Sequence, residues 1–307
     1  MITRDPEAFF AFAARCLPDP ARALPAGLFL VAPEGITLAA ESAQDNAYMA
    51  MTGGIDAELA LAEHRALAKA LSAHLPVVTF PGDPATPDAV FPNNAFATAP
   101  GRLVIGHMRH AVRQREAARA DIRGFFAGVL GYRTIDLSRQ PGIAELTGSL
   151  VIDRARNLGY CGLSERCDAE GAAAMHTAFG LDATLVFDLA PGEYHTNVLL
   201  QIYAGRLAVA CPDGFADPAL AGAILRFHAP HALALDAAAR RAYAGNGLAV
   251  ATDAAFLGAR AVAALPAAGH RAFADAGFRL HAVPLPEIEK AGGSLRCCVG
   301  EIFRDPT

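Results

Sequence analysis

The chain has 307 residues, 53% of them hydrophobic, and a formal charge of −5 at pH 7. That hydrophobic share is enough for a large core, whereas the scattered lysines and arginines argue against a nucleic-acid-binding surface. No uninterrupted run of about 18 apolar residues is present, so no membrane span is expected. The acidic N-terminus lacks the basic start of a signal peptide, which favours a cytoplasmic location.

The predicted elements begin with a strand at 28–32, an amphipathic helix at 57–71 and a strand at 77–80. Two strands and a helix follow, at 95–99, 103–108 and 113–126. A strand, a return strand, a helix with an acidic start and a further strand are then predicted at 148–153, 158–163, 168–179 and 183–188. The same order recurs at 197–203, 207–211, 217–227 and 232–235.

The last part of the chain is less regular. A strand at 248–251 is followed by a more helical stretch, and one long strand is predicted at 295–303. Strand alternation in that segment would place Cys297 and Cys298 on opposite faces, so that only Cys297 faces inward.

The repeated units open at regular intervals. Their openings lie at Phe91, Glu145, Tyr194, Tyr243 and Gly292, in steps of 54, 49, 49 and 49 residues. A fixed period of this size indicates stacked or radially arranged units. The fifth unit stops short, and its missing parts are present near the N-terminus, so a ring closed by both termini explains the pattern. We therefore predict an α/β fold in one domain, residues 1–307: five β-β-α-β units around a pseudo-fivefold axis.

Three reactive side chains occupy corresponding places in different units. Cys297 is the predicted nucleophile, and His195 could protonate a leaving amine and then deprotonate water. Glu145 could orient the imidazole and hold a cationic substrate. Taken singly, each is more often a buried thiol, a structural histidine or a solvated carboxylate; their shared register favours the catalytic interpretation.

Further polar residues are candidates for substrate binding. Asn93 and Asn94 are either plain turn residues or two amides that bind an amidine or urea group, and Asn246 lies in the same register. Arg113 and Arg166 flank helices, where most arginines are surface residues, but either could clamp a carboxylate. The sequence contains no P-loop, Rossmann glycine pattern or metal-binding His/Cys spacing.

Several of these stretches resemble the guanidino-group-modifying enzymes, the pentein superfamily. They include Phe91-Pro-Asn-Asn, Tyr194-His-Thr-Asn and Gly292-Gly-Ser-Leu-Arg-Cys297, which resemble the amidinotransferase-like branch. Gly162-Leu-Ser-Glu-Arg166 resembles a stretch of the dimethylargininases. The resemblance spans roughly 28–303.

The resemblance implies a five-bladed α/β propeller that cleaves C–N bonds of arginine or a close analogue through a covalent thiouronium on Cys297. It implies no metal and no organic cofactor, with His195 as acid and base, Glu145 as its partner and Arg166 at the amino-acid end of the substrate. Small guanidino compounds are the expected binding partners, and the resemblance is compatible with a homodimer.

Two departures affect the substrate. Asn93 and Asn94 stand where many relatives place a carboxylate, which Asp88 could replace, and Ser149 stands where several have Asp. Neutral amides suit a ureido group, so arginine dihydrolase or citrulline ureidohydrolase chemistry is an alternative. Two further alternatives are an amidinotransferase that uses the same intermediate and a non-catalytic binding factor.

Overall fold

The computed structural model describes residues 1–304, whose strands form five small sheets. In every sheet two strands pair antiparallel, and a third strand pairs parallel with the second. A parallel pair needs a long crossover connection, and helices fill that connection. The α/β class and the β-β-α-β unit are therefore confirmed.

The elements of the units follow one another along the chain. The first unit contains β4 (Phe96–Ala99), β5 (Arg102–Ile105), α3 (Ala111–Ala117), α4 (Ala120–Gly124), a π-helical turn (Phe125–Val129) and β6 (Arg133–Asp136). The second contains α5 (Leu146–Ser149), β7 (Leu150–Asp153), β8 (Leu158–Leu163), α6 (Ala169–Phe179) and β9 (Ala183–Asp188). The third contains β10 (Leu200–Tyr203), β11 (Leu207–Ala210), α7 (Pro218–Phe227) and β12 (Ala232–Ala234). The fourth contains α8 (Ala237–Arg241), β13 (Leu248–Ala251), β14 (Ala254–Gly258), α9 (Ala259–Ala264), α10 (Ala267–Asp275) and β15 (Arg279–Val283).

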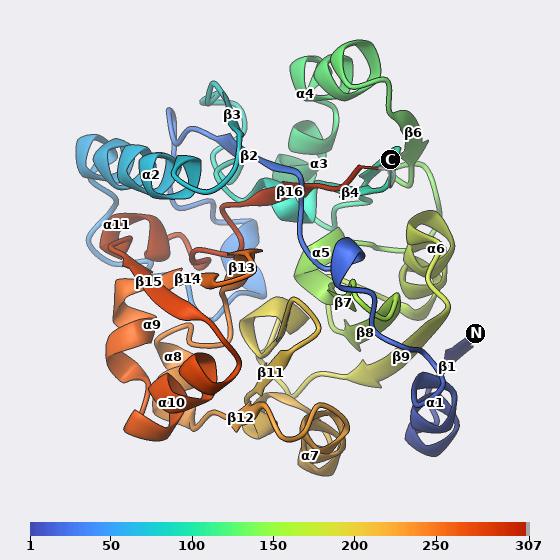
Figure 1. Cartoon of the computed structure of the whole chain (residues 1–307). Coiled ribbons are helices and arrows are strands. Elements are labelled where there is room, and N and C mark those ends of the chain that lie inside the picture. Colours follow the sequence, from blue (N-terminus) through green and yellow to red (C-terminus); the bar gives the residue numbers. More distant parts are fainter. Residues whose placement is uncertain (305–307) are drawn as a thin grey trace.

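The fifth sheet joins the two ends of the chain. After α11 (Pro286–Glu289), β16 (Gly300–Ile302) pairs antiparallel with β2 (Gly27–Val31), which pairs parallel with β3 (Val77–Phe80). The helix α2 (Ala57–Ser72) connects β2 to β3. Figure 1 shows β16 beside β2, with α2, α4, α6, α7 and α10 at the periphery and the first strand of each unit nearer the centre. The predicted pairing of the two ends is therefore present.

The N-terminus adds two elements outside the repeat. The strand β1 (Ile2–Thr3) extends the second sheet by pairing with β9, and α1 (Pro6–Ala13) follows it. Aspartates cap several helices: the Asp5, Asp56, Asp168, Asp217 and Asp236 side chains each accept hydrogen bonds from main-chain N–H groups of the first turn. Such caps satisfy donors that a helix start leaves unpaired.

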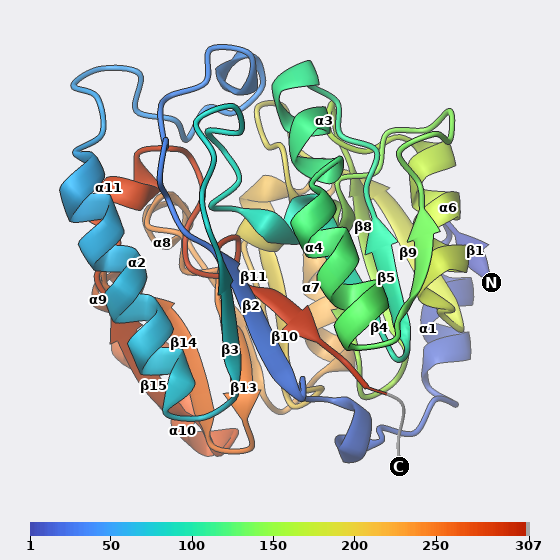
Figure 2. The ribbon, with the colours of Figure 1, turned by 90° about the horizontal axis from the view of Figure 1, so that it is seen from above.

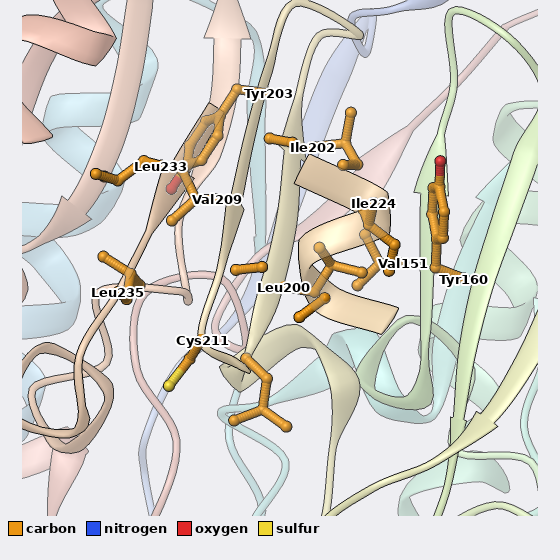
Figure 3. Close-up of a cluster of buried hydrophobic side chains, with 14 of the residues drawn as sticks. Val151, Tyr160, Leu200, Ile202, Tyr203, Val209, Cys211, Ile224, Leu233 and Leu235 are labelled. Atoms are coloured by element: carbon orange, nitrogen blue, oxygen red, sulfur yellow. The ribbon is translucent and has the colours of Figure 1, made fainter. Parts of the chain in front are cut away.

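Apolar side chains fill the space between sheets and helices. The largest cluster takes side chains from β10, β11, β12 and α7, as Figure 3 shows with Leu200, Val209, Leu233 and Ile224. The strands β10 and β11 are buried on both faces, and the sequence of β11 is accordingly a continuous apolar run. A rigid core of this kind fixes where the ends of the strands lie.

The segment 32–56 has little regular structure. It contains only a short 3-10 turn, Ser42–Gln44. In Figure 2 it lies at the same end of the molecule as α3 and α11, whereas the described C-terminus lies at the other end. That end also holds the loops that precede the inner strands, and the segment is therefore placed to contribute to a site there.

Three parts of the predicted secondary structure are wrong. The long strand at 295–303 is only β16; Cys297 and Cys298 lie in a turn in which both main-chain N–H groups donate to the Ser294 carbonyl, at 3.0 and 3.3 Å. The strands β14 and β15 replace part of a helical prediction; in β14 every residue is buried, and that burial overrides the weak strand preference of its alanines. The predicted strand start at Gly148 is instead the short helix α5.

Candidate active site

The five inner strands share one end, and each is preceded there by a polar residue of the predicted set. Asn94 precedes β4, Glu145 precedes α5 and β7, and His195 precedes the 3-10 turn and β10. Asn246 precedes β13, and Cys297 precedes β16. All five side chains are less than 4% exposed. The repeat therefore places them at one end of the molecule, as the register predicts.

Two asparagine amides hold the Cys297 thiol. The Asn246 Nδ2 group donates to Cys297 Sγ at 3.3 Å, and Asn197 Nδ2 lies 3.8 Å from the same sulfur. The Asn246 Oδ1 atom accepts from the main-chain N–H of Arg296 at 3.0 Å, which ties the amide to the turn. Asn246 thus contacts the predicted nucleophile. Sequence reasoning missed Asn197, although Asn197 and Asn246 differ by one 49-residue period.

The Cys297 thiol is fully buried, and burial raises its pKa. The hydrogen bonds from the Ser294–Cys297 turn, Asn246 and Asn197 act in the opposite direction, as does the charge of Arg296. The net shift is upward, so the thiol is favoured over the thiolate in the free protein at neutral pH. Cys298 is also buried, in the apolar cluster around Leu295 and Val299. The strand argument that separated the two cysteines is wrong, but Cys297 lines the cavity described below and Cys298 is absent from its lining.

Glu145 and His195 form a buried pair. His195 Nε2 lies 2.9 Å from Glu145 Oε2, and both side chains are 0% exposed. Burial alone would raise the pKa of Glu145, but the charge of Arg166, the hydrogen bond and charge of His195 and the charge of Arg113 lower it well below its usual range. Glu145 is therefore a carboxylate, which only accepts hydrogen bonds.

Burial sets the charge of the His195 imidazole, and the Glu145 carboxylate sets which of its nitrogens carries the proton. Burial lowers the pKa of His195 and outweighs the opposing effect of Glu145, so the ring is neutral near pH 7. A neutral ring carries one proton, and the contact with Glu145 requires it on Nε2. Nδ1 then has a free lone pair, and it has no hydrogen-bond partner within residues 1–304. The ring edge lies against Gly148: a Cβ there would be 2.9 Å from His195 Nδ1 and 2.7 Å from Asn94 Oδ1.

Both predicted arginines contact Glu145. Arg166 NH1 lies 3.2 Å from Glu145 Oε2, while Arg166 Nε donates to Asp45 at 2.7 Å. Arg113 pairs with Glu116 through two hydrogen bonds, at 2.8 and 3.1 Å, and its NH1 lies 3.7 Å from Glu145. The two guanidinium groups thus lie around one carboxylate and give this end of the molecule a dense buried charge network.

A small cavity opens beside these groups, with about 20 Å³ of room for the centres of water-sized molecules. Its lining includes Cys297, Asn94, Asp88, Arg113 and Arg166, together with Ser42, Asn46, Phe91, Tyr194, Ala291, Gly292 and Gly293. His195 and Glu145 are not in this lining, but Arg113 and Arg166, which are, contact Glu145. Asn93 is not in the lining either, and neither end of its buried amide has a partner within residues 1–304.

Two oxygen acceptors in this cavity lack partners within the described residues. They are Asp88 Oδ1 and Asn94 Oδ1. The other Asp88 oxygen accepts from the Ser42 hydroxyl at 2.5 Å, and burial raises the pKa of Asp88. Buried acceptors without partners are costly, so these atoms suit a ligand that donates N–H groups.

The segment 32–56 supplies residues that sequence reasoning missed. Ser42, Asp45 and Asn46 contact Asp88, Arg166 and the Gly292 carbonyl respectively. The segment has no periodic pattern, so nothing in the sequence marked it. Within residues 1–304, no group of three His, Cys, Asp or Glu side chains is placed to hold a metal ion, and no helix combines the length and apolar character that a membrane crossing needs.

Comparison with known families gives one family match. A family model described as N,N dimethylarginine dimethylhydrolase, eukaryotic, matches residues 32–304. Among curated proteins, a shikimate dehydrogenase (NADP(+)) of Streptomyces avermitilis is 32% identical over 193 residues. That match covers 57% of this chain and 62% of the dehydrogenase, so the chain spans less than two thirds of that relative.

Solved structures share the fold at low identity. The N-terminal domain of ArgZ, an arginine dihydrolase from cyanobacteria, is a cysteine-to-serine mutant bound to substrate; it is 19% identical, with a TM-score of 0.78 over 90% of this chain and 98% of that chain. The ternary complex of AgrE with ornithine and NAD+ is 20% identical, with a TM-score of 0.77 over 93% of this chain and 40% of that chain. A dimethylarginine dimethylaminohydrolase adduct is 19% identical, with a TM-score of 0.68 over 91% of this chain and all of that chain.

Proposed function

The chain belongs to the N,N-dimethylarginine dimethylhydrolase family, as the resemblance to penteins predicts, and on that premise we propose that it hydrolyses C–N bonds of guanidino compounds, arginine or a close analogue such as methylarginine. The observation that carries the proposal is the cavity lined by a buried thiol and by two acceptors, Asp88 Oδ1 and Asn94 Oδ1, that have no partner within residues 1–304. A guanidinium is a planar cation with five N–H donors in arginine and at least three in a dimethylarginine, and it satisfies both acceptors while bringing its carbon to the sulfur.

The bound cation also activates the thiol. Burial raises the pKa of Cys297 in the free protein, and a positive charge beside the sulfur lowers it again. The thiol proton passes to His195 Nδ1, which has the free lone pair. The Cys297 sulfur then bonds to the guanidinium carbon, and the C–N bond breaks as imidazolium gives its proton to the leaving amine.

Hydrolysis completes the cycle. His195, neutral again, takes a proton from a water that attacks the thiouronium carbon. The C–S bond breaks, and Cys297 leaves with the electron pair and regains its proton from the His195 imidazolium. The product oxygen loses its remaining water proton to solvent and becomes the ureido carbonyl. Glu145 stays charged throughout, because its arginine neighbours keep its pKa low, and it stabilises the imidazolium form of His195.

The arginines are the proposed binders of a substrate carboxylate. Arg113 and Arg166 line the cavity, and guanidinium groups bind carboxylates through paired hydrogen bonds. In this structure Asp45 and Glu116 occupy part of their donors. A substrate carboxylate therefore competes with Asp45, which belongs to the segment 32–56.

Asn94 favours a second candidate, arginine dihydrolase chemistry. A neutral amide carbonyl beside the thiol accepts from a ureido group as readily as from a guanidinium, so the first product could remain bound and react again. ArgZ, the arginine dihydrolase, shares the fold.

For the whole molecule we propose that the five sheets close into a propeller with pseudo-fivefold symmetry, and that residues 1–307 form one catalytic domain.

A substrate panel tests the proposal. The protein is incubated with arginine, methylated arginines, agmatine and citrulline, and ammonia, methylamines, citrulline and ornithine are quantified. Amine or ammonia release without an added acceptor supports hydrolysis, and ornithine from arginine identifies the dihydrolase. Turnover that requires an amine acceptor would make it an amidinotransferase, and no reaction with any compound would reject the catalytic proposal. The Cys297→Ser variant serves as the blank.

A further inference from the structure

A second cavity lies beyond the catalytic thiol along the inner strands. It holds about 490 Å³ of space free of atoms, part of it open to solvent, and residues of β7, β10, β13 and β16 line it. These strands run away from the Cys297 cavity, because Asn94, His195 and Cys297 precede their unit's first strand. Asn197 lines the second cavity and also contacts Cys297 Sγ, so a single layer of side chains separates the two spaces.

The lining of this second cavity contains more positively charged than negatively charged side chains. Arg154 and Arg296 are its two cations, and Glu301 is the only acidic residue in its lining. Glu301 pairs with Arg296 at 2.7 Å. Arg154 instead donates to the Thr98 carbonyl at 3.2 Å and stacks on the Phe303 ring, with 4.2 Å from its guanidinium carbon to the ring centre.

Arg154 therefore lacks a carboxylate partner within residues 1–304. Burial, together with the positive charge of Arg296, lowers the pKa of Arg154 to about 10, against the opposing effect of Glu301. The aromatic contact keeps the guanidinium plane fixed. Arg154 is partly buried, and an arginine in this state is stabilised by any anion that reaches it.

We propose that this second cavity is a binding site for a small oxyanion, a phosphate or a carboxylate, held between Arg154 and Arg296. Arg296 already donates to the Val299 carbonyl and to Glu301, at 2.8 and 2.7 Å, and Arg154 to the Thr98 carbonyl. The remaining N–H groups of the two guanidinium groups match the oxygens of either ligand, and one bound negative charge balances the excess of the lining. The other polar side chains there are already engaged: Gln201 donates to the Gly247 carbonyl, and Thr147 donates to the Asn93 carbonyl at 3.0 Å. Specificity therefore comes from the two arginines.

The position of the site connects it to the thiol. The main-chain N–H of Arg296 is held by Asn246, whose amide donates to Cys297 Sγ. An anion that binds the Arg296 side chain thus acts on the residue directly before the nucleophile. The two cavities have no charged side chain in common. An oxyanion site in the second cavity is therefore distinct from the proposed site for the substrate carboxylate.

Calorimetric titration of the full chain tests the proposal without any substrate. Inorganic phosphate and acetate are titrated separately, and the one that binds identifies the oxyanion class. We expect Arg154→Met to weaken binding at least about tenfold, because it removes charge-assisted hydrogen bonds while keeping a long apolar stem against Phe303. The matched control is Arg279→Gln, which removes an exposed arginine paired with Asp253 and should leave the affinity unchanged.

A second measurement covers the case in which Arg154→Met does not fold. Crystals of the unaltered protein are soaked in selenate, whose anomalous signal locates the ion. A peak between the Arg154 and Arg296 guanidinium groups is expected. No heat with either anion, an affinity that Arg154→Met leaves intact, or selenate bound only elsewhere would each overturn the proposal. None of these results depends on whether the protein hydrolyses guanidino compounds.

Discussion

A single carboxylate decides what His195 can do. Glu145 accepts the Nε2 proton of His195 at 2.9 Å and remains charged because Arg166 and Arg113 surround it. The two arginines keep Glu145 charged, the charged carboxylate keeps the His195 proton on Nε2, and Nδ1 is therefore left with a free lone pair. Neighbours also act on the Cys297 thiol: Asn246 and Asn197 contact its sulfur, while burial raises its pKa.

We expect Cys297→Ser to abolish turnover on the best substrate of the panel. A buried serine hydroxyl is a far weaker nucleophile than a thiolate beside a cation. The melting temperature should change little, because serine accepts from Asn246 as the sulfur does. Cys298→Ser should retain most of the activity and lose some stability, since it buries a hydroxyl in an apolar cluster. Equal activity in the two variants would contradict the assignment.

The second residue-scale prediction concerns His195→Ala. It removes the proton carrier, and the rate constant should fall at least about 100-fold, the usual scale for a lost general acid and base. The control is His176→Ala, which removes a half-buried histidine that contacts Thr184 in another part of the second unit. Steady-state kinetics on both variants decides the matter, and a loss of less than about tenfold in His195→Ala would remove His195 from the mechanism.

At the scale of an element, α5 positions the histidine through a residue without a side chain. Gly148 lets the His195 ring and the Asn94 amide approach the helix backbone, and a Cβ there would meet His195 Cε1 at 2.8 Å. Leu146, beside Glu145, has a positive φ of 23°. A non-glycine residue with this conformation is held by its surroundings, which indicates that packing fixes α5 firmly.

We therefore predict that Gly148→Ala lowers the rate constant by about 100-fold, because a shift of about 1 Å in a catalytic group has effects of that size. Gly124→Ala is the control: it lies in α4, with nothing within 4 Å of an added Cβ. Both variants should remain folded by circular dichroism. An unaffected rate in Gly148→Ala would show that the histidine position is not critical.

The helix α2 contains a group that makes stability depend on pH. Burial lowers the pKa of His64 to about 4; the charge of Glu34 opposes this shift and that of Arg65 adds to it. In the unfolded chain His64 binds a proton as the pH falls below about 6.5, whereas in the folded protein it does so only near pH of about 4. The free energy of unfolding therefore falls as the pH drops through this window, by about 3 kcal/mol in full.

His64→Leu should remove that part of the pH dependence. The measurement is urea unfolding at pH 7.5 and 4.5 for the original chain and the variant, with the exposed His270→Ala as the control. The loss of stability between the two pH values should be smaller in His64→Leu by about 2 kcal/mol. The same pH dependence in both proteins would show that His64 is not the responsible group.

At the scale of the whole molecule, the fifth sheet ties the chain ends together. Gly300 of β16 pairs with Phe29 of β2, and Ile302 pairs with Gly27. The Thr98 hydroxyl of β4 donates to the Glu301 carbonyl at 2.7 Å, which links the fifth sheet to the first unit. Because only Cys298 and Val299 separate Cys297 from β16, this pairing also helps to hold the Cys297 thiol in place.

We expect Ile302→Ala to destabilise the molecule by about 2–4 kcal/mol, the cost of removing a buried isoleucine side chain. Calorimetry should show one unfolding transition at a lower temperature, as a single domain requires. Val129→Ala removes a side chain that is 70% exposed and should change little. Two separate transitions in either protein would contradict the single domain.

The period of 49 residues was the strongest signal in the sequence, because copies of one unit must present corresponding positions to the same place. It placed Glu145, His195, Asn246 and Cys297 in a common register, and the structure has them before successive inner strands. It failed where local pattern and packing disagree. The turn around Cys297 has the apolar composition of a strand, and the alanine-rich β14 has the composition of a helix.

The sequence alone determined the repeated unit, the family and the set of reactive side chains, because these follow from spacing and residue type. Only the tertiary structure decided their chemical states. The segment 32–56 carries no pattern, yet its Asp45 and Ser42 bind Arg166 and Asp88. The proton on His195, the charge on Glu145 and the burial of the Cys297 thiol depend on neighbours more than 20 residues away in the chain. Electrostatic energies depend on distance in space and on solvent exposure, and sequence spacing fixes neither.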